Sequence, residues 1–587
     1  MKSFVIGKEH RSKQDVRIPK DAFKTHFHLI GGTGKGKTTA IHTMLHALLF
    51  DPIEQPCFFI IDRLGNFSQE LLLWLASEFC PAFVRDRLVF IQPSREDVVA
   101  TFNPLLSESP AHAYYRIERS TDIMLRAWDS QEIAQMPRLG KWVYNSFAAA
   151  SNLGLTISDC WHFLLPGSPY HHQLINILPP RLQAEWTEIT QSRSHEAIRI
   201  LESTKNRLRP YFESDILRRM FGSTQSRLDV LRMMREGRIV IVDLSPRNRL
   251  GEQLANTIGA LLINEVIAQV RSLPRDVRYP TYMFLDEFQN FVGPDLESAL
   301  PELRNLGLRM ILSHQSFSQL ERGDYDLKNI IFQAQSRMIF GVQGEDAEIL
   351  ANEVASMTFN AYKVKEELYS LRQIIKGHRI ETLHGSSEQE QSGDSWSDAS
   401  GKNSGSGEQV ADPFDYQNRR KISRSTSEGE TDSRSRGGTS SRSTTTSKSQ
   451  TLVPIHETFR ELSSRTYQGF DEQKSEWGRE IRNLHTGRAL LKLVNDNALH
   501  QVDVKRSAPG FLQYDMQTIA REFPWAIEAM DQLIEENFQS DFFVPASRVD
   551  AEAEQRIQEV LRHRTGPGGR ASVSEGPKPP EGESPLM

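Results

Sequence analysis

Residues 27–39 read FHLIGGTGKGKTT, an apolar run that leads into a glycine-rich loop, and the helical segment TAIHTMLHALLF begins at residue 39. The loop matches the pattern G-x-x-x-x-G-K-[ST] in its usual setting between a strand and a helix. Backbone amides of such a loop surround phosphates, the lysine reaches the β and γ oxygens, and the following hydroxyl binds Mg²⁺. A glycine-rich turn without a nucleotide is the alternative, which the flanking strand and helix disfavour. We therefore expect ATP to contact Gly31, Gly32, Thr33, Gly34, Lys35, Gly36, Lys37, Thr38 and Thr39, with Thr38 as a Mg²⁺ ligand.

Short apolar runs recur on both sides of this loop. Each is four to seven residues long and nearly all apolar, which is typical of strands buried on both faces of a parallel sheet. Helical patterns separate most of them, so we predict a doubly wound α/β fold, a RecA-like P-loop ATPase core with a mainly parallel sheet. The predicted strands are FHLIG (27–31), CFFIID (57–62), RLVFI (87–91), RIVIVDL (238–244), TYMFLDE (281–287), RMILS (309–313) and SRMIFGV (336–342).

Two stretches interrupt this core. The first, residues 107–235, contains no comparable strand run and is predicted to be an all-α insertion domain. In the second, 18 of the 66 residues from 385 to 450 are serine, which predicts a disordered insertion. The chain folds again afterwards, because GRALLKLV (487–494) and HQVDVKR (500–506) alternate as two strands. The expected domains are the first part of the ATPase core (1–106), the helical insertion (107–235), the second part of the core (236–383), the disordered Ser-rich insertion (384–450), the final core strands (451–510), a C-terminal helical region (511–566) and a disordered tail (567–587).

An acidic pair follows the most apolar predicted strand, in TYMFLDEF (281–288). We expect Asp286 to hold the Mg²⁺ shell and Glu287 to orient and deprotonate the attacking water. Adjacent carboxylates also occur in plain surface turns, but the glycine-rich loop favours the catalytic interpretation.

Two later residues are further catalytic candidates. Gln315 directly follows the predicted strand RMILS and His314, where an amide contacts the γ-phosphate or the attacking water. The alternative is a polar residue that begins a helix. Arg304, in LRNLGLR, either completes a neighbouring subunit's site as an arginine finger or forms an ion pair on a solvated helix.

Two weaker signals stay open. Asp62 ends a predicted strand in FIIDRLGN, where it either lines the ligand side of the sheet or forms a turn before Gly65. Residues 205–219, KNRLRPYFESDILRR, mix arginines with Tyr211 and Phe212, which suits DNA phosphates and equally suits a solvated helix face.

Composition limits the class of protein to which this chain can belong. The 70 Lys and Arg against 76 Asp and Glu give a net charge of −6, so nucleic-acid binding would need a local basic surface. The three cysteines lack disulfide or zinc spacing. The amino-terminal stretch has no signal-peptide core, and no apolar run approaches the roughly 18 residues of a membrane span. We expect a cytoplasmic protein that reaches the inner membrane only through a partner.

Taken together, these residues resemble the HerA/FtsK superfamily of hexameric DNA-translocating ATPases, and within it the TraG/TraD-like type IV coupling proteins of conjugation. The most diagnostic phrase is LPELRNLGLRMILSHQSFSQL, which is similar to the family's arginine-then-glutamine module. The resemblance implies that Arg304 serves a neighbouring subunit and that Gln315 reads the γ-phosphate. The other matching phrases are HFHLIGGTGKGKTT, FIIDRLGNF, VATFNPLL, GRIVIVDLS, FLDEFQNF and GRALLKLV.

The resemblance also implies cofactors and partners. It implies ATP and Mg²⁺ as cofactors, a homo-hexameric ring, DNA as the moved substrate in conjugative or type IV secretion-like transfer, and a relaxase or membrane secretion channel as partner. Coupling proteins usually carry amino-terminal transmembrane helices, and none is recognisable in this sequence. A HerA-like translocase partnered with a nuclease or defence effector therefore remains an alternative. A secretion-type ATPase that acts on protein and a nucleotide-dependent recruitment module are the alternatives from other classes.

Overall fold

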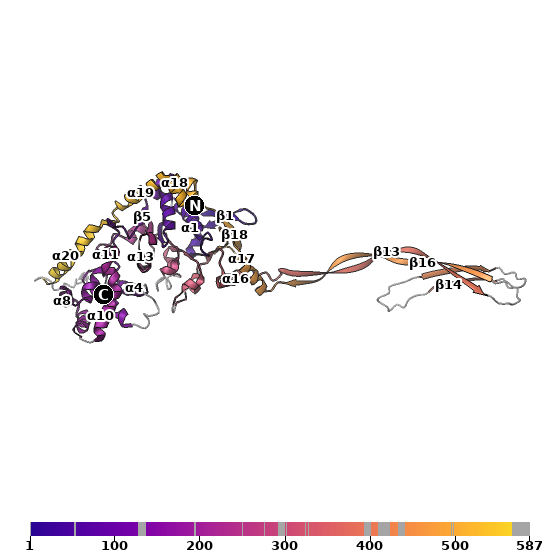
Figure 1. The fold of residues 1–587 in the computed structure, drawn as a ribbon, viewed down its shortest axis with the longest axis horizontal. Coiled ribbons are helices and arrows are strands. Elements are labelled where there is room, and N and C mark those ends of the chain that lie inside the picture. Colours follow the sequence, from indigo (N-terminus) through magenta and orange to yellow (C-terminus); the bar gives the residue numbers. More distant parts are fainter. Residues whose placement is uncertain are drawn as a thin grey trace, which may run out of the picture. The chain divides into compact units, whose positions relative to one another are not determined.

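Two compact units make up the described chain (Figure 1). Unit 1 comprises Met1–Thr358 and Lys474–Met587, and unit 2 comprises Phe359–Gln473. The computed structural model describes residues 2–51, 54–107, 109–126, 137–192, 195–248, 250–274, 276–291, 300, 302–322, 325–326, 328–391, 401–408, 423–431, 441–494, 496, 498–506 and 508–565.

An 11-stranded sheet forms the centre of unit 1, in the order β2-β1-β18-β17-β12-β3-β9-β8-β4-β7-β5. The strands from β12 to β5 run parallel, and β17, β18, β1 and β2 continue the sheet in antiparallel pairs. The strands are β1 (Ser3–Glu9), β2 (Asp15–Pro19), β3 (Phe27–Ile30), β4 (Cys57–Asp62), β5 (Leu88–Ile91), β7 (Ile239–Asp243), β8 (Thr281–Leu285), β9 (Leu308–His314), β12 (Ser336–Ile339), β17 (Arg488–Lys492) and β18 (Leu499–Val504). Every strand predicted from an apolar or alternating run is confirmed, and the sheet is the mostly parallel, RecA-like core that the sequence predicts.

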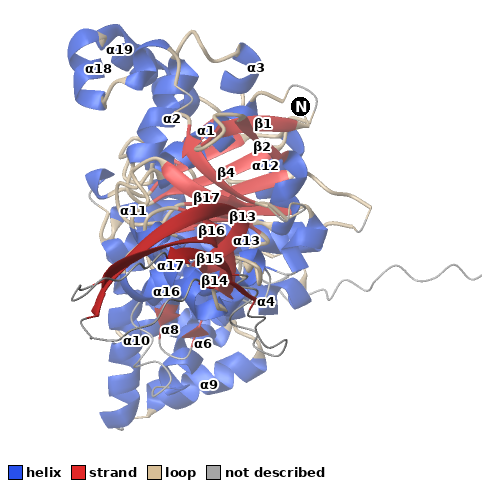
Figure 2. Ribbon diagram, turned by 90° about the vertical axis from the view of Figure 1, so that its right-hand side faces the viewer, coloured by secondary structure: helices blue, strands red, loops and turns tan. Residues whose placement is uncertain are grey.

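Helices cover both faces of this sheet (Figure 2). On one face α1 (Lys37–Leu49) packs against α2 (Asn66–Ala76), and on the other α12 (Val230–Glu236) packs against α13 (Glu252–Ser272). These crossovers bury the central strands on both sides, and all residues of β3, β4, β8 and β12 are buried. That burial explains why these strands are almost continuously apolar.

A helical region interrupts the core where the sequence predicted it. Between residues 107 and 235 the described residues form helices and no strand. Its core holds Phe147, Phe163 and Trp186, each fully buried. The helices are α4 (Pro110–Arg126), α6 (Pro137–Asn152), α7 (Trp161–Leu164), α8 (His171–Asn176), α9 (Pro180–Gln191), α10 (His195–Glu213) and α11 (Asp215–Met220).

The C-terminal part of unit 1 joins the core to this helical region. Helices α18 (Met516–Glu522) and α19 (Pro524–Phe538) lie near α2 and β5, and the short strand β19 (Val544–Pro545) pairs with β6 (Val98–Val99). On α20 (Ala546–Thr565), the buried guanidinium of Arg556 donates to Asp159 of the helical region at 3.0 and 3.1 Å. The remaining short elements of unit 1 are α3 (Ala82–Arg85), β10 (Glu321–Arg322), β11 (Tyr325–Asp326), α15 (Lys328–Ile331) and α16 (Gly344–Thr358).

Unit 2 is a long antiparallel ribbon. Its strands β13 (Val364–Gln391) and β16 (Ser441–Tyr467) pair along their whole length, and β15 (Ser423–Thr431) and β14 (Gly401–Glu408) extend the sheet. The first turn of α17 (Phe470–Arg482) also belongs to this unit.

The predicted boundaries of the Ser-rich insertion need correction. Residues 359–383 and 451–473, expected in the core, belong to unit 2, and residues 384–391 and 441–450, expected to be disordered, are paired strands. A strand ladder is built from backbone hydrogen bonds, so a polar composition does not prevent it when apolar neighbours begin the pairing. Residues 392–400, 409–422 and 432–440 and the predicted tail, 567–587, lie outside the described residues.

Candidate nucleotide site

The glycine-rich loop connects β3 to α1, as predicted. Gly34 and Gly36 have φ values of 71° and 112°, which residues other than glycine rarely adopt. A Cβ on Gly31 would lie 2.5 Å from the Cβ of Phe340, and one on Gly36 would lie 3.1 Å from the Cα of Gly487. The loop therefore needs its glycines both for its backbone conformation and for close packing against β12 and β17.

Lys37 opens α1 and turns back over the loop. Its Nζ donates to the carbonyl oxygen of Gly31 at 2.6 Å and to that of Gly32 at 3.4 Å. The side chain is only 7% exposed, and burial lowers its pKa, whereas the charges of Glu287 and Asp286 act in the opposite direction. The ammonium group is thus held beside the loop and close to both predicted acids.

The acid Asp286 follows β8 at the edge of the sheet where β3 and β9 also end. Its Oδ1 accepts a hydrogen bond from Ser313 Oγ at 2.7 Å. Burial raises the pKa of Asp286 to about 6, and the nearby carboxylates of Glu287 and Asp62 contribute to the rise. A buried carboxylate beside a second carboxylate is a site at which a cation is electrostatically favoured.

The second acid, Glu287, is held by two amides. Its φ is 53°, an uncommon conformation for a residue with a side chain and one that concentrates at functional sites. Its Oε2 accepts from Gln289 Nε2 at 2.6 Å and its Oε1 from Gln315 Nε2 at 2.7 Å. The Oε1 of Gln315 in turn accepts from Thr33 Oγ1 at 2.8 Å. Gln315 therefore bridges the glycine-rich loop and the acid.

Arg304 is the predicted site residue that the fold does not bring to this loop. It begins a short 3₁₀ turn, Arg304–Leu306, just before β9, and its side chain is exposed. Gln315 comes just after β9, and the seven-residue strand between the two positions spans about 23 Å at 3.3 Å per residue. Arg304 therefore lies where the parallel strands begin, whereas the glycine-rich loop of its own chain lies where they end.

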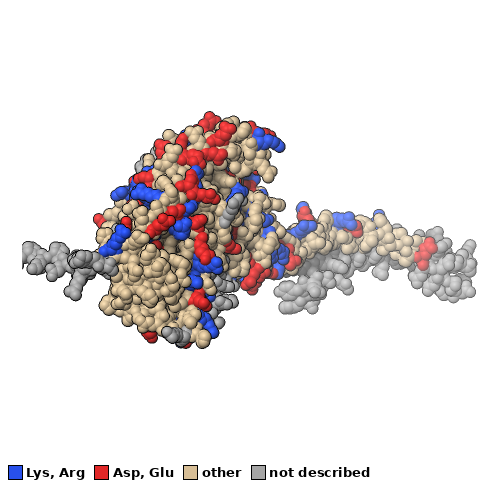
Figure 3. All heavy atoms as spheres, turned by 60° about the vertical axis from the view of Figure 1, so that its left-hand side comes forward, with Lys and Arg blue, Asp and Glu red and all other residues tan. Residues whose placement is uncertain are grey.

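The structure places the residues of the two open signals. Asp62 forms the turn, because its carboxylate accepts from the backbone amides of Leu64, Gly65 and Ser68 at 2.7 to 3.0 Å, and it also lies close enough to the site to raise the pKa of Asp286. In the basic run, Arg218 and Arg219 form ion pairs with Asp550, and Tyr211 is buried. Over the face of the described chain shown in Figure 3, Lys and Arg alternate with Asp and Glu and gather into no continuous basic surface.

Family models match the chain on both sides of the acidic pair. The model of the central domain of helicase HerA matches residues 4–266, and the model of the TraM recognition site of TraD and TraG matches residues 280–402. These two matches support a HerA/FtsK-type, coupling-protein-like ATPase. The first match contains the glycine-rich loop and the second contains the acids and Gln315, so both halves of the site lie in regions that the family models cover.

Solved structures of a coupling protein are similar to this HerA/FtsK-type chain. The unbound monoclinic form of the bacterial conjugative coupling protein TrwBdeltaN70 is 14% identical with a TM-score of 0.46, covering 85% of this chain and 88% of that chain. The plasmid coupling protein TrwB with ADP and Mg²⁺ has the same identity and TM-score, with coverage of 84% and 89%. Its complex with the GTP analogue GDPNP is 15% identical with a TM-score of 0.45, with coverage of 86% and 90%. Among curated proteins none matches.

The donors and acceptors of the site fit a Mg²⁺-nucleotide. The loop would offer backbone amides and the Lys37 ammonium to phosphate oxygens, and Asp286 and the Thr38 hydroxyl are oxygen ligands of the kind that Mg²⁺ prefers. Sequence reasoning missed Ser313 and Gln289, which hold Asp286 and Glu287 in place. Ser313 follows the general rule that polar residues at the carboxyl ends of parallel strands meet there, whereas Gln289 lies in the 3₁₀ turn Phe288–Asn290 beyond β8.

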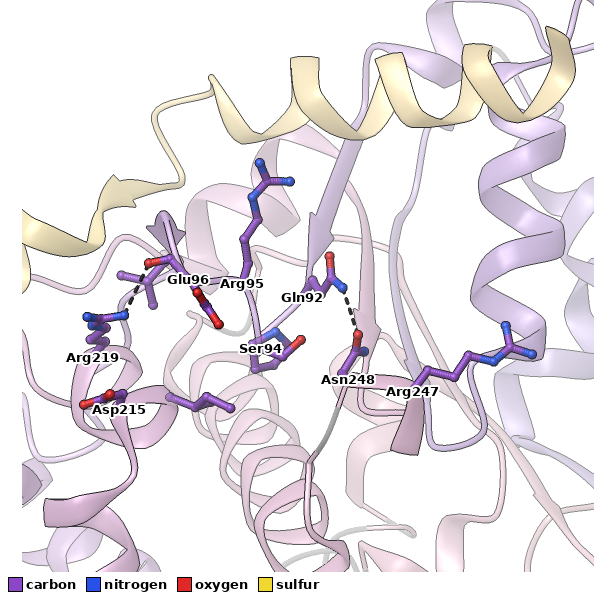
Figure 4. Close-up of a pocket in the computed structure, with 11 residues that line it drawn as sticks. Gln92, Ser94, Arg95, Glu96, Asp215, Arg219, Arg247 and Asn248 are labelled. Carbon is purple, nitrogen blue, oxygen red and sulfur yellow. Dashed lines mark hydrogen bonds between the residues drawn. The ribbon is translucent and has the colours of Figure 1, made fainter. Parts of the chain in front are cut away.

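A second hollow of this HerA/FtsK-type core lies beyond the ends of β5 and β7 (Figure 4). Its volume is about 710 Å³, and Gln92 donates across it to Asn248 at 2.8 Å. Its arginines are engaged within the chain, because Arg95 pairs with Asp97 and Glu535 and Arg219 pairs with Asp550. β9, β8 and β4 separate it from the strand that carries the glycine-rich loop.

Within the described ranges, no helix combines the length and the apolar composition that crossing a membrane requires.

Proposed function

We propose that this chain is an ATP-driven DNA translocase of the coupling-protein type, which hydrolyses ATP at the interfaces of a hexameric ring. The observation that carries the proposal is the bridge from Thr33 through Gln315 to Glu287, which links the phosphate-binding loop to the candidate base. A group placed there meets the γ-phosphate and the attacking water together. Such a link is what a site that senses ATP and hydrolyses it requires.

The side chains of the chain divide the work of hydrolysis. Lys37 exchanges the carbonyl of Gly31 for phosphate oxygens and neutralises the charge that develops on them. Glu287 takes the proton of the attacking water, and Gln315 orients that water or the γ-phosphate. Mg²⁺, held by Thr38 and Asp286, would supply further charge neutralisation on the phosphates.

The position of Arg304 supports a ring. The guanidinium is exposed and lies at the edge of the sheet away from its own loop, so it completes only a site on another copy. An arginine supplied by a neighbour stabilises the transition-state charge and makes hydrolysis depend on assembly. Successive sites around a ring would then hydrolyse ATP in response to the movement of the neighbouring subunits.

DNA is the proposed substrate because both family models that match the chain describe proteins of the helicase and coupling-protein type. The model that matches residues 280–402 describes a TraM recognition site of coupling proteins, which favours a partner of the relaxase-complex class and transfer of DNA through a membrane channel. The match to a HerA central domain equally suits a translocase that serves a nuclease or a defence effector. Turnover stimulated by DNA fits both, whereas turnover indifferent to DNA favours transport of protein.

The deciding experiment measures ATP turnover with and without single- and double-stranded DNA. We expect DNA to stimulate the wild type, and we expect Glu287→Gln to bind ATP but to turn it over about 10²- to 10⁴-fold more slowly. Lys37→Ala should lose nucleotide affinity as well. Glu345→Gln, which changes an exposed carboxylate at the start of α16, is the matched control and should behave as the wild type. Normal turnover in Glu287→Gln would refute the proposal.

A further inference from the structure

A continuous row of buried polar side chains crosses three neighbouring strands behind the nucleotide site. Arg337 on β12, His28 on β3 and His314 at the end of β9 are 2%, 0% and 0% exposed. Arg337 and His28 are register partners, and the next pair on the same side of β3, Ile30 and His314, brings the second imidazole alongside. None of the three belongs to the loop or to the acidic pair.

The hydrogen bonds of this row permit one arrangement of protons. A guanidinium only donates, so Arg337 Nε–H donates to Nδ1 of His28 at 2.8 Å, and the proton of His28 must be on its Nε2. That N–H then donates to Nε2 of His314 at 2.7 Å, which leaves the second ring's proton on its Nδ1. Nδ1–H of His314 donates to the carbonyl oxygen of Ser316 at 3.0 Å, and a carbonyl only accepts. Both ends of the row therefore require the same pair of neutral tautomers.

The charge at the beginning of the row is compensated. Arg337 forms an ion pair with Glu353 of α16, and its guanidinium lies 4.5 Å from the ring centroid of Phe332. A buried cation with an ion-pair partner keeps its charge, so the direction of donation is fixed from Arg337 outward.

The other end of the row touches both catalytic segments. Ser316 directly follows Gln315, so the last hydrogen bond of the row spans the residue whose amide contacts Glu287. The ring of His314 also packs edge-on against Phe288, with centroids 5.6 Å apart, and Phe288 directly follows Glu287. One imidazole thus contacts the segment of the sensor and the segment of the base.

We propose that Arg337, His28 and His314 form a positioning relay that holds Gln315 between Thr33 and Glu287. The relay rests on the proposed hydrolysis at this site, and its members are buried positioning residues outside the loop and the acidic pair. Their role is to fix the backbone from residue 314 to 316, which sets where the Gln315 amide points. Each member acts through the next, so loss of the middle imidazole disconnects both ends.

The test replaces the middle of the relay. His28→Phe keeps an aromatic ring of similar size but leaves Arg337 Nε–H without its acceptor and His314 Nε2 without its donor. We expect kcat for ATP to fall about tenfold or more, and we expect KM for ATP to rise only by the factor by which the wild type prefers ATP to ADP, because the phosphate loop is intact and the sensor is not. His28→Gln supplies one acceptor and one donor and should recover most of kcat.

A second readout separates positioning from simple loss of stability. The affinities for fluorescent ATP and ADP analogues should converge in His28→Phe, because Gln315 no longer distinguishes the γ-phosphate. Arg337→Lys keeps the charge opposite Glu353 but loses the planar Nε donor, and it should show the same loss of kcat and of ATP preference. It serves as the deciding variant if His28→Phe does not fold.

The outcomes separate the relay from the function on which it rests. If Glu287→Gln is inactive while folded His28→Phe and Arg337→Lys keep wild-type kcat and ATP preference, the relay is refuted and the ATPase site stands. If Glu287→Gln hydrolyses ATP normally, the proposed function itself fails. Equal losses in His28→Phe and His28→Gln, with unchanged ATP preference, would show a purely structural role and would also overturn the relay.

Discussion

The imidazoles of His28 and His314 are buried bases that must stay neutral, and this makes folding sensitive to acid. Burial lowers the pKa of His314 to about 3 and that of His28 well below its usual value, and the charge of Arg337 acts in the same direction. The unfolded chain takes up these protons near pH 6.5. Between the two pKa values the unfolded state binds more protons, so the free energy of unfolding falls as the pH is lowered.

We therefore expect each ring to cost about 2 kcal/mol of stability between pH 7.5 and pH 5.0. Urea unfolding at the two pH values measures this loss in the wild type and in His314→Asn, which removes one of the two bases. The variant should be less stable at pH 7.5 but should lose less stability on acidification. His195→Asn, at an exposed position on α10, is the control and should keep the wild-type pH dependence. An unchanged pH dependence in His314→Asn would contradict the prediction.

Some site residues could be predicted one by one and others only in pairs. Lys37, Asp286 and Glu287 belong to short local patterns, and Gln315 follows a recognisable strand, so their places beside the glycine-rich loop could be predicted from the sequence. His28 and Arg337 are single polar residues inside apolar strands, and they are 309 positions apart. Only the strand order and register bring them together, and neither can be deduced from local patterns.

At the level of elements, one edge of the sheet is partly covered by a single side chain. β5 is the last strand, and an unpaired edge of this kind is open to association with other chains. Asn537 of α19 replaces the missing neighbour: its Oδ1 accepts from the amide of Phe90 and its Nδ2 donates to the carbonyl of Phe90, both at 2.9 Å. The amide side chain thereby satisfies a buried donor and a buried acceptor at once.

Asn537→Ala leaves both backbone groups of Phe90 without partners. We expect the local opening of β5 to become about 2 kcal/mol easier, which corresponds to amide exchange about 30-fold faster in a peptide that covers residues 88–91. Gln539→Ala, at an exposed position one residue beyond α19, is the matched control and should leave exchange unchanged. Wild-type exchange in Asn537→Ala would show that water satisfies Phe90 instead.

The elements differ in how clearly their sequences announce them. The central strands are nearly pure apolar runs because they are buried on both faces, and all were predicted. β2 carries Asp15 and Arg17 on its exposed side and β1 ends in Lys8 and Glu9, so the two strands are only partly apolar and their sequence reads as a polar segment. β13 and β16 were missed because the Ser-rich composition predicts disorder and the pairing extends from apolar residues nearer the core sequence.

On the scale of the whole molecule, all predicted site residues lie in unit 1, yet Arg304 lies apart from the others. Arg304 lies at the far edge of the sheet, whereas the loop, the acids and Gln315 lie together at the near edge. If the arginine acts on a neighbouring copy, each site takes its phosphate loop and base from one subunit and its finger from the next.

Mixing two inactive variants tests this arrangement. Arg304→Ala keeps its own loop and base, and Glu287→Gln keeps its own Arg304, so each lacks a different half of every site. In an equimolar mixture that reassembles at random, about a quarter of the interfaces join an intact base to an intact finger. We expect ATP turnover to reappear on mixing, in proportion to that fraction.

Lys37→Ala mixed with Glu287→Gln is the control. Both changes affect the same side of the interface, so no subunit in the mixture carries an intact loop and an intact base together. Turnover should therefore stay absent. Failure of the first mixture to regain turnover, with exchange of subunits demonstrated by fluorescence transfer, would place Arg304 outside the neighbouring site and leave it as a surface charge.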